Sequence, residues 1–412
     1  MPGNYFRFIY FQGCRPAVLQ LLFLVLILSS ASTLADGAGT IVYTQRFDGT
    51  PTIVNEVDWT YVRATPSLSF GTKRVIWTGA GANMVPNPNP PPDNVRVAGS
   101  DGLFYRPNGH LVVGNWQGGQ FWIFDPAGTD IVIDGGDNGA FPFHMLLHPN
   151  EQDFLSTPAL SAGPSCSDGT PRGCFGVYDH TPLNTTLLCL APKDSVTNED
   201  LQPVTFIADE NLNIFVLFTT MASVQFGGAG FASFDLGSTT SAGCGADMAM
   251  KALIPPGIEE AHSVSWDPFL SDANGPDPHS DFIVFANSRL AHIRVDDPGT
   301  PGATATVVSS IDMATEPVCD SLLPAGLHEF DQGALTGNGI AIVGDEANGF
   351  AALVDYSQNT NGTILDGNNT VCLTEFLHQG IDDIAPLTGL GALQFQGPGG
   401  NSIFEDGFEA KD

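Results

Sequence analysis

The stretch "DGLFYRPNGHLVVGNWQGGQFWIFDPAG", residues 101–128, decides the fold because it contains three short apolar runs separated by turns. The first run ends at Arg-Pro-Asn-Gly, and the third ends in an Asp that precedes a Pro/Gly turn. Aromatic and β-branched runs bounded by Gly, Pro and Asn are typical of strands joined by tight turns. The stretch therefore predicts three consecutive antiparallel strands.

The same layout recurs along the sequence, although the spacing between copies is loose. With 47 glycines, 30 prolines and only 14% charged residues, the protein lacks the long amphipathic runs that helices need. Repeated strand meanders of this kind predict the blades of a β-propeller. The predicted blade openings lie near residues 103, 145, 206, 262, 329 and 382.

The last opening, "IDDIAPLTGLGALQF" at 381–395, supplies only one or two strands. The N-terminal runs TIVYTQRF, DWTYVRA and RVIWTG can complete that blade, which would also remove exposed sheet edges. We therefore predict an all-β protein with a single β-propeller over residues 36–395. Six blades are expected, with five or seven as alternatives. A β-sandwich or jelly roll shares this composition, but the repeated Asp after the third strand favours the propeller.

The two ends of the sequence are predicted to lie outside the propeller. Arg7 and Arg15 precede the apolar run AVLQLLFLVLILSS, and small residues follow up to Ala35, which is the pattern of a signal peptide over residues 1–35. The run is too short for a membrane span. We expect a secreted or periplasmic protein without a membrane span, ending in a flexible tail at 396–412.

The charge of the protein excludes one class of partner. There are 45 Asp and Glu residues against 14 Lys and Arg, giving a net charge of −31. Such an acidic surface repels phosphate backbones, so nucleic acid is not expected as a partner, whereas cations are attracted. The expected partner is a small molecule or a protein bound through the propeller loops, and the protein is expected to be a monomer.

Six cysteines follow the predicted cleavage site, and an even number in an exported protein indicates disulfides. Cys166 and Cys174 enclose a short polar loop and form the simplest pair. Sequence order then suggests Cys189–Cys244 and Cys319–Cys372, among the pairings that six cysteines allow.

Histidines at or near the blade openings suggest a metal centre. The innermost strand of each blade lines a central channel, so residues from several openings converge near one axis. Imidazoles from separate blades would suit zinc or iron. In this hypothesis the metal ligands are His144, His148, His262, His328, His378 and Asp382. The structural alternative for each histidine is a hydrogen bond that satisfies a buried carbonyl or links two blades.

Acidic residues lie beside these histidines. Glu329 and Asp331 in "GLHEFDQGAL", residues 326–335, are candidate proton acceptors in catalysis. Asp382 and Asp383 could instead hold calcium, which prefers oxygen ligands. The pair Asp345–Glu346 offers the same chemistry but is predicted to lie in a solvent-facing turn.

Across about 100–395 the pattern resembles six-bladed propellers of the gluconolactonase, NHL-repeat and streptogramin-lyase type. "DGLFYRPNGHLVVGN" resembles their common strand–turn–strand, so the match concerns architecture. The resemblance to NHL-type amidating lyases implies zinc held by histidines from separate blades. The C-terminal "IFEDGFE" resembles short tails of exported gammaproteobacterial proteins, which implies a bacterial source.

Two functions follow from these observations. The first is an exported propeller that binds a ligand or partner without catalysis. The second is a metal-dependent lyase, hydrolase or oxygenase with a multi-histidine centre in the channel. No nucleophile elbow, HExxH motif or phosphate-binding loop occurs in the sequence, and propellers support both roles.

Overall fold

The computed structural model describes most of the second half of the protein and, in the first half, mainly strands. The described residues are 36–45, 52–78, 85–86, 94–95, 102–105, 111–115, 120–124, 131–134, 142–147, 154–158, 174–180, 183–190, 201–208, 214–220, 229–234, 250–253, 261–272, 276–300, 302–319, 323 and 326–386. Between residues 79 and 262, side chains are described only at 102–103 and 111–113. The predicted signal peptide and C-terminal tail both lie outside these ranges.

The described residues form six antiparallel sheets of four or five strands each. The first contains β1 (Gly37–Gln45), β2 (Ile53–Val62), β3 (Ser67–Phe70), β4 (Arg74–Thr78) and β27 (Ile381–Pro386). The second contains β7 (Leu103–Tyr105), β8 (Leu111–Asn115), β9 (Gln120–Phe124) and β10 (Ile131–Asp134), and the third β11 (Pro142–Leu147), β12 (Phe154–Pro158), β13 (Cys174–His180) and β14 (Leu183–Leu190). The fourth contains β15 (Leu201–Ala208), β16 (Ile214–Thr220), β17 (Ala229–Phe234) and β18 (Met250–Leu253). The fifth contains β19 (Ala261–Trp266), β20 (His279–Ala286), β21 (Arg289–Asp296) and β22 (Thr304–Asp312), and the sixth β23 (Phe330–Leu335), β24 (Ile340–Asp345), β25 (Phe350–Asp355) and β26 (Val371–Phe376).

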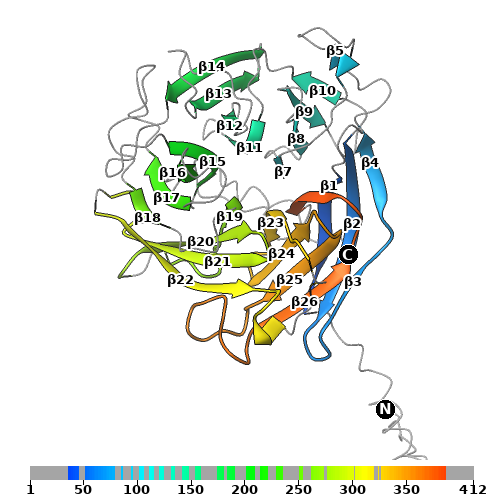
Figure 1. Cartoon of the computed structure of the whole chain (residues 1–412), viewed down its shortest axis with the longest axis vertical. Helices are drawn as coiled ribbons and strands as arrows, with labels where there is room; N and C mark the ends of the chain where they lie inside the picture. The colour runs from blue at the N-terminus through cyan, green and yellow to red at the C-terminus, as the bar shows by residue number, and fades with distance from the viewer. Residues whose placement is uncertain are drawn as a thin grey trace, which may run out of the picture.

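The sheets stand around a common centre, as Figure 1 shows. Within each sheet the strands form a meander, and the innermost strand contacts the innermost strands of the two neighbouring sheets, in the order β7, β11, β15, β19, β23, β27 and back to β7. Two short strands, β5 (Val85–Pro86) and β6 (Asn94–Val95), pair outside this ring. The predicted all-β propeller is confirmed. The six sheets are counted over the described residues, and the blade number of the whole protein stays a prediction.

The first and last described strands meet in a single sheet, which closes the ring. β27 pairs with β1, with Ile41 opposite Pro386 and Tyr43 opposite Ile384. On its other side β1 pairs with β2 along its whole length. The predicted closure by N-terminal strands is therefore confirmed. Among the residues that the structure describes, no helix is long and apolar enough to cross a membrane.

The apolar core lies between neighbouring sheets. One buried cluster joins Phe285 and Ile311 of the fifth sheet to Phe330 and Val354 of the sixth. A second joins the sixth sheet to the closing sheet, and a third joins the closing sheet to β7 and β8. Gly333 allows the close approach of the fifth and sixth sheets, because a Cβ at this position would lie 2.5 Å from the Phe285 ring.

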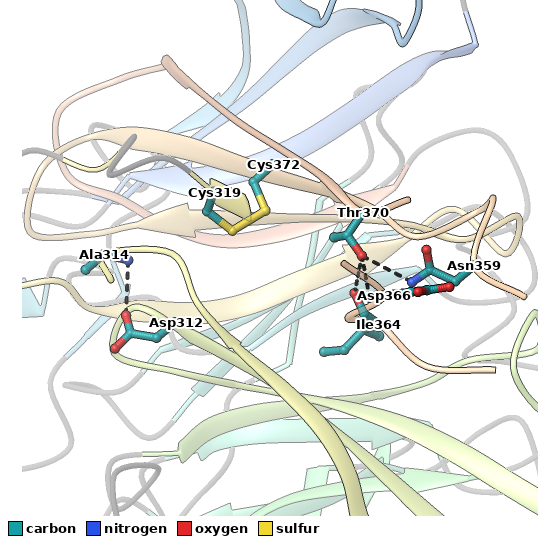
Figure 2. Close-up of a disulfide and its surroundings, with 8 residues drawn as sticks. All are labelled: Asp312, Ala314, Cys319, Asn359, Ile364, Asp366, Thr370 and Cys372. Atoms are coloured by element: carbon teal, nitrogen blue, oxygen red, sulfur yellow. Dashed lines mark hydrogen bonds between the residues drawn. A yellow bond between two sulfur atoms is a disulfide. The ribbon is translucent and has the colours of Figure 1, made fainter. Parts of the chain in front are cut away.

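A disulfide joins the outer parts of the fifth and sixth sheets. Cys319 ends the single-turn 3₁₀ helix η4 (Pro317–Cys319) and is bonded to Cys372 on β26, 53 residues away in sequence (Figure 2). This confirms the third predicted pair. Both cysteines are buried. The other two predicted pairs include cysteines outside the described residues or without a described side chain.

Buried carboxylates lie at the ends of strands in the fifth sheet. Asp281 contacts His292, His279 at 3.0 Å and Arg294 at 3.1 Å. Asp267 is fully buried and accepts hydrogen bonds from the Tyr356 hydroxyl at 2.5 Å and the Phe269 backbone at 2.8 Å. Since Tyr356 follows β25, the Asp267–Tyr356 bond links the fifth and sixth sheets. Burial raises the pKa of Asp267 to about 6, from an ordinary value of 3.8.

Asp267→Asn is expected to change how stability depends on pH. The folded protein holds the Asp267 proton more tightly than the unfolded protein does, so this carboxyl makes the free energy of unfolding fall between about pH 4 and about pH 6, by about 3 kcal/mol. Asparagine does not ionise and can still bond Tyr356. The variant should therefore gain stability relative to wild type as pH rises through this window. Urea denaturation across this window, with Asp277→Asn as an exposed control, measures the difference. The prediction is contradicted if the difference in unfolding free energy between Asp267→Asn and wild type stays the same across this pH window.

Removal of the disulfide is expected to destabilise the fold. A cross-link between residues 53 apart restricts the unfolded protein, and the double variant Cys319→Ala/Cys372→Ala should lose about 2–4 kcal/mol of unfolding free energy. Chemical denaturation of this variant and of wild type provides the measurement. Equal denaturation midpoints would show that the cross-link does not stabilise the fold.

Candidate functional site

The innermost strands share a backbone irregularity near their starts. A register shift interrupts the pairing of β11, β15, β19, β23 and β27 with the next strand outward. In β23, Asp331 and Gln332 together oppose Gly344, and in β27, Asp382 and Asp383 together oppose Thr44. Such β-bulges redirect side chains and are frequent next to functional sites. Both bulges therefore present acidic side chains at the centre of the ring.

The bulges of β23 and β27 contribute to a cluster of three carboxylates, which we call the acidic group. It consists of Asp331, Glu346 and Asp382, with one oxygen of each within 4.8 Å of the others. Asp331 and Asp382 are buried and Glu346 is partly buried. At this separation two ionised carboxylates repel each other by about 3 kcal/mol at an effective dielectric constant of about 20. A cation between them would remove that repulsion.

Gly344 allows β27 to approach the turn that carries Glu346. A Cβ at Gly344 would lie 2.9 Å from the backbone oxygen of Asp382 and 2.9 Å from the Ile381 side chain. Any side chain at this position would push the bulge of β27 away from β24. The glycine therefore contributes to bringing Asp382 and Glu346 together.

The second residue of each bulge anchors it to β7. The Asp383 carboxylate accepts a hydrogen bond from the Gly102 backbone at 2.7 Å. The Gln332 amide donates to the Leu103 carbonyl and accepts from the Leu103 N–H at 3.3 Å. One residue of each bulge therefore belongs to the acidic group, and the other fixes the strand against the second sheet.

His328 lies just before β23 and is held by a neighbouring turn. Its Nδ1 lies 2.8 Å from a carboxylate oxygen of Asp345, which is fully buried. The Asn348 amide donates to the same oxygen at 3.0 Å and to the Leu327 carbonyl at 2.8 Å. With both Asn348 protons used in this way, Nδ1–H of His328 donates to Asp345 and Nε2 remains as the basic nitrogen. Asp345 therefore fixes the tautomer of His328.

Glu329 is bound to the same turn through its backbone. Its N–H donates to Asp345 at 3.1 Å, and its carbonyl accepts from the Glu346 N–H at 2.9 Å. These bonds connect the segment before β23 to the turn that carries Glu346. The segment is thereby positioned beside the acidic group.

His378 lies before β27, on the side of the closing strand β1. Its Nδ1 is 3.2 Å from the hydroxyl of Tyr43, a buried residue of β1. Burial lowers the pKa of His378, and the positive charge of Lys73 lowers it further. The imidazole is therefore neutral at neutral pH.

Of the predicted site residues, the structure brings Asp331 and Asp382 together. His328 is bonded to Asp345, and His378 to Tyr43. His144 and His262 lie at the register shifts of β11 and β19, but their side chains are outside the described set, as is the whole of His148. A shared histidine centre therefore stays a prediction.

One expectation for this region is wrong. The pair Asp345–Glu346 is predicted from the sequence to face solvent, whereas the side chain of Asp345 is fully buried. The turn is tight, because the Gly349 N–H donates to the Asp345 carbonyl at 2.8 Å and Gly349 has a φ of +75°. The sequence "DEANG" does predict a tight turn. No local sequence pattern, however, predicts which β-bulge this turn contacts in the folded protein.

Comparisons with known proteins give fold-level similarity only. No family model matches the sequence, and no curated protein matches it. Among solved structures, the protein is similar to one titled as a nidogen/laminin complex, at 8% identity and a TM-score of 0.46, with 84% of this chain and 97% of that one covered.

Two further structures belong to types that the sequence pattern resembles. One is regucalcin of Agrobacterium tumefaciens, titled a calcium-binding protein, with 12% identity, a TM-score of 0.41, and coverage of 66% of this chain and 76% of that one. The other is a streptogramin B lyase, with 10% identity, a TM-score of 0.38, and coverage of 69% and 70%. These similarities concern the fold alone, and the assignment of the β-propeller fold rests on the sheets described above.

Proposed function

We propose that this protein is an exported β-propeller that binds a ligand at the centre of its ring through a divalent cation held by the acidic group. One observation carries the proposal: carboxylate oxygens of Asp331, Glu346 and Asp382 lie within 4.8 Å of one another. These residues come from an inner strand, a turn and the closing strand, so the cluster is a product of the tertiary fold.

The donor atoms favour calcium over the zinc or iron expected from the histidines. All three side chains offer oxygen, which is the ligand type that calcium prefers, whereas zinc and iron sites in proteins commonly include nitrogen or sulfur. Calcium also accepts additional ligands such as backbone carbonyls, water or oxygen atoms of a bound molecule. The ligand class that fits is therefore a molecule with carboxylate or hydroxyl oxygens.

Export is supported by two independent features. The predicted signal peptide at 1–35 is the first. The second is the disulfide Cys319–Cys372, since disulfides persist in oxidising compartments such as the periplasm and the extracellular space.

A second candidate function is catalysis, and the His328–Asp345 pair favours it. The pair is bonded at 2.8 Å and lies beside the turn that carries Glu346. An imidazole oriented by a carboxylate can act as a general base, and a cation on the acidic group could polarise a substrate. Glu329 and Asp331 remain the alternative proton acceptors predicted from the sequence.

Calcium is expected to bind the purified protein after treatment with a chelator and dialysis, and to raise its unfolding temperature. At a concentration of about 100 times Kd the stabilisation should be about 2.7 kcal/mol. Asp382→Asn removes a charged ligand and should weaken binding at least about tenfold. Isothermal titration with calcium, magnesium and zinc in turn provides the measurement.

Glu375→Gln serves as the control for this experiment, because Glu375 is an exposed acid outside the group. Equal calcium affinity of Asp382→Asn and wild type would exclude the acidic group as the site. Tighter binding of zinc than of calcium would favour the histidine centre instead.

The catalytic candidate predicts turnover of an activated aryl ester that depends on His328. His328→Gln should abolish this turnover while leaving calcium affinity and unfolding temperature close to the wild-type values, because Gln can still donate to Asp345. Steady-state hydrolysis rates with calcium present measure the effect. If wild type hydrolyses the ester no faster than buffer alone does, the catalytic candidate is excluded and the binding function is the one supported.

A further inference from the structure

The loop between β25 and β26 contains an Asn–Gly pair in a setting unlike that of the other pairs. The described residues hold three such pairs, Asn338–Gly339, Asn348–Gly349 and Asn361–Gly362. An Asn–Gly sequence can deamidate spontaneously, because glycine has no side chain to hinder attack of its own nitrogen on the preceding amide. Whether it does so depends on how firmly the fold holds the two residues.

The fold restrains the pair Asn348–Gly349. The Gly349 N–H donates to the Asp345 carbonyl at 2.8 Å, so the nitrogen that would attack is already bonded. The Asn348 amide donates to Leu327 and to Asp345. A Cβ at Gly349 would lie 2.7 Å from the His378 carbonyl, which shows that the backbone is packed.

The pair Asn338–Gly339 is restrained at the glycine. Asn338 is exposed, but Gly339 is buried and a Cβ there would lie 2.6 Å from the Ser357 Cα. The Gly339 carbonyl also accepts from the Tyr356 N–H at 2.8 Å. Closing a five-membered ring through the glycine nitrogen requires the backbone to turn, and these contacts resist it.

Among the described residues, the pair Asn361–Gly362 has neither the close packing nor the backbone hydrogen bonds that restrain the glycines of the other two pairs. Asn361 is exposed, and outside Gly362 and its two neighbours in sequence the only described atom within 4 Å of a Cβ built on this glycine is Nη2 of Arg294, at 3.7 Å. The guanidinium is permanently charged. It also pairs with Asp281 at 3.1 Å, and it places a positive charge near the backbone of Gly362, where such a charge favours loss of the peptide proton. Figure 2 shows the part of this loop from Asn359 to Thr370 beside the disulfide.

A hydroxyl also lies near the other reacting atom, as it does at Asn338, where Thr336 donates to the amide oxygen. Thr363 Oγ1 lies 2.8 Å from the amide oxygen of Asn361 and 2.6 Å from the Leu365 carbonyl. When it donates to Asn361, it stabilises the charge that develops on that oxygen during attack.

We propose that Asn361 is a site of spontaneous deamidation, with the Gly362 nitrogen as nucleophile and Arg294 as the stabilising charge. The Gly362 nitrogen loses its proton and bonds to Cγ of Asn361, and the bond from Cγ to the amide nitrogen Nδ2 breaks with release of ammonia. Water then opens the resulting succinimide at either carbonyl. The products are aspartate or isoaspartate at position 361, so the exported protein would gain a negative charge with age.

The test is incubation of the folded protein at mildly alkaline pH, followed by digestion and mass spectrometry of the three peptides. Position 361 should acquire aspartate and isoaspartate several-fold faster than 338 and 348. In denaturant the three rates should converge, because the sequence Asn–Gly is the same in each. A folded-state rate at 338 or 348 equal to or above that at 361 overturns the proposal.

Arg294 variants test the role of the charge. Arg294→Lys keeps the charge and should deamidate at 361 at close to the wild-type rate, whereas Arg294→Gln should be several-fold slower there. The rates at 338 and 348 serve as internal controls, since a general loosening of the fold would raise them. Equal rates at 361 in the Lys and Gln variants would exclude Arg294.

Discussion

The pairing of β27 with β1 is the interaction on which the rest of the structure depends. It joins the first and last described strands and converts a row of sheets into a ring. Tyr61 of the closing sheet and the neighbouring Arg63 join that sheet to the sixth, because both donate to Asp355. The candidate site is part of the same closure, since Asp382 of β27 contributes to the acidic group. Ring closure and site assembly are therefore one structural event.

Buried carboxylates are a recurrent means of joining sheets in this protein. Asp267 bonds Tyr356 between the fifth and sixth sheets, Asp355 bonds Tyr61 between the sixth and closing sheets, and Asp383 bonds the backbone of Gly102. Each of these has a described donor, in keeping with the high cost of burying a charge without one. The acidic group places three carboxylates against one another. This mutual proximity is the reason that we associate it with a cation.

Much of the fold could be predicted from the sequence, because strand and turn signals are local. The blade openings predicted near 103, 145, 206, 262, 329 and 382 lie at or next to β7, β11, β15, β19, β23 and β27. The fourth strand of most sheets was missed: "TATVVSSID" at 304–312 faces solvent on many positions and lacks the aromatic density of an inner strand. Edge strands need little burial, so their sequences carry a weaker signal. The acidic group could be predicted only in part. Asp331 and Asp382 stand at predicted openings, whereas Glu346 reaches them through a turn whose partner is set by packing between sheets.

The position of β27 as the last described strand has a consequence for biosynthesis. A ribosome delivers β1 and β2 first, and β1 can gain its second neighbour only when β27 has emerged. Until then β1 presents an unpaired edge, which is the kind of surface that promotes association with other proteins. Contacts between residues this far apart in sequence form slowly. Maturation should accordingly be post-translational, and a chaperone that shields strand edges would act on the interval before the last strand arrives.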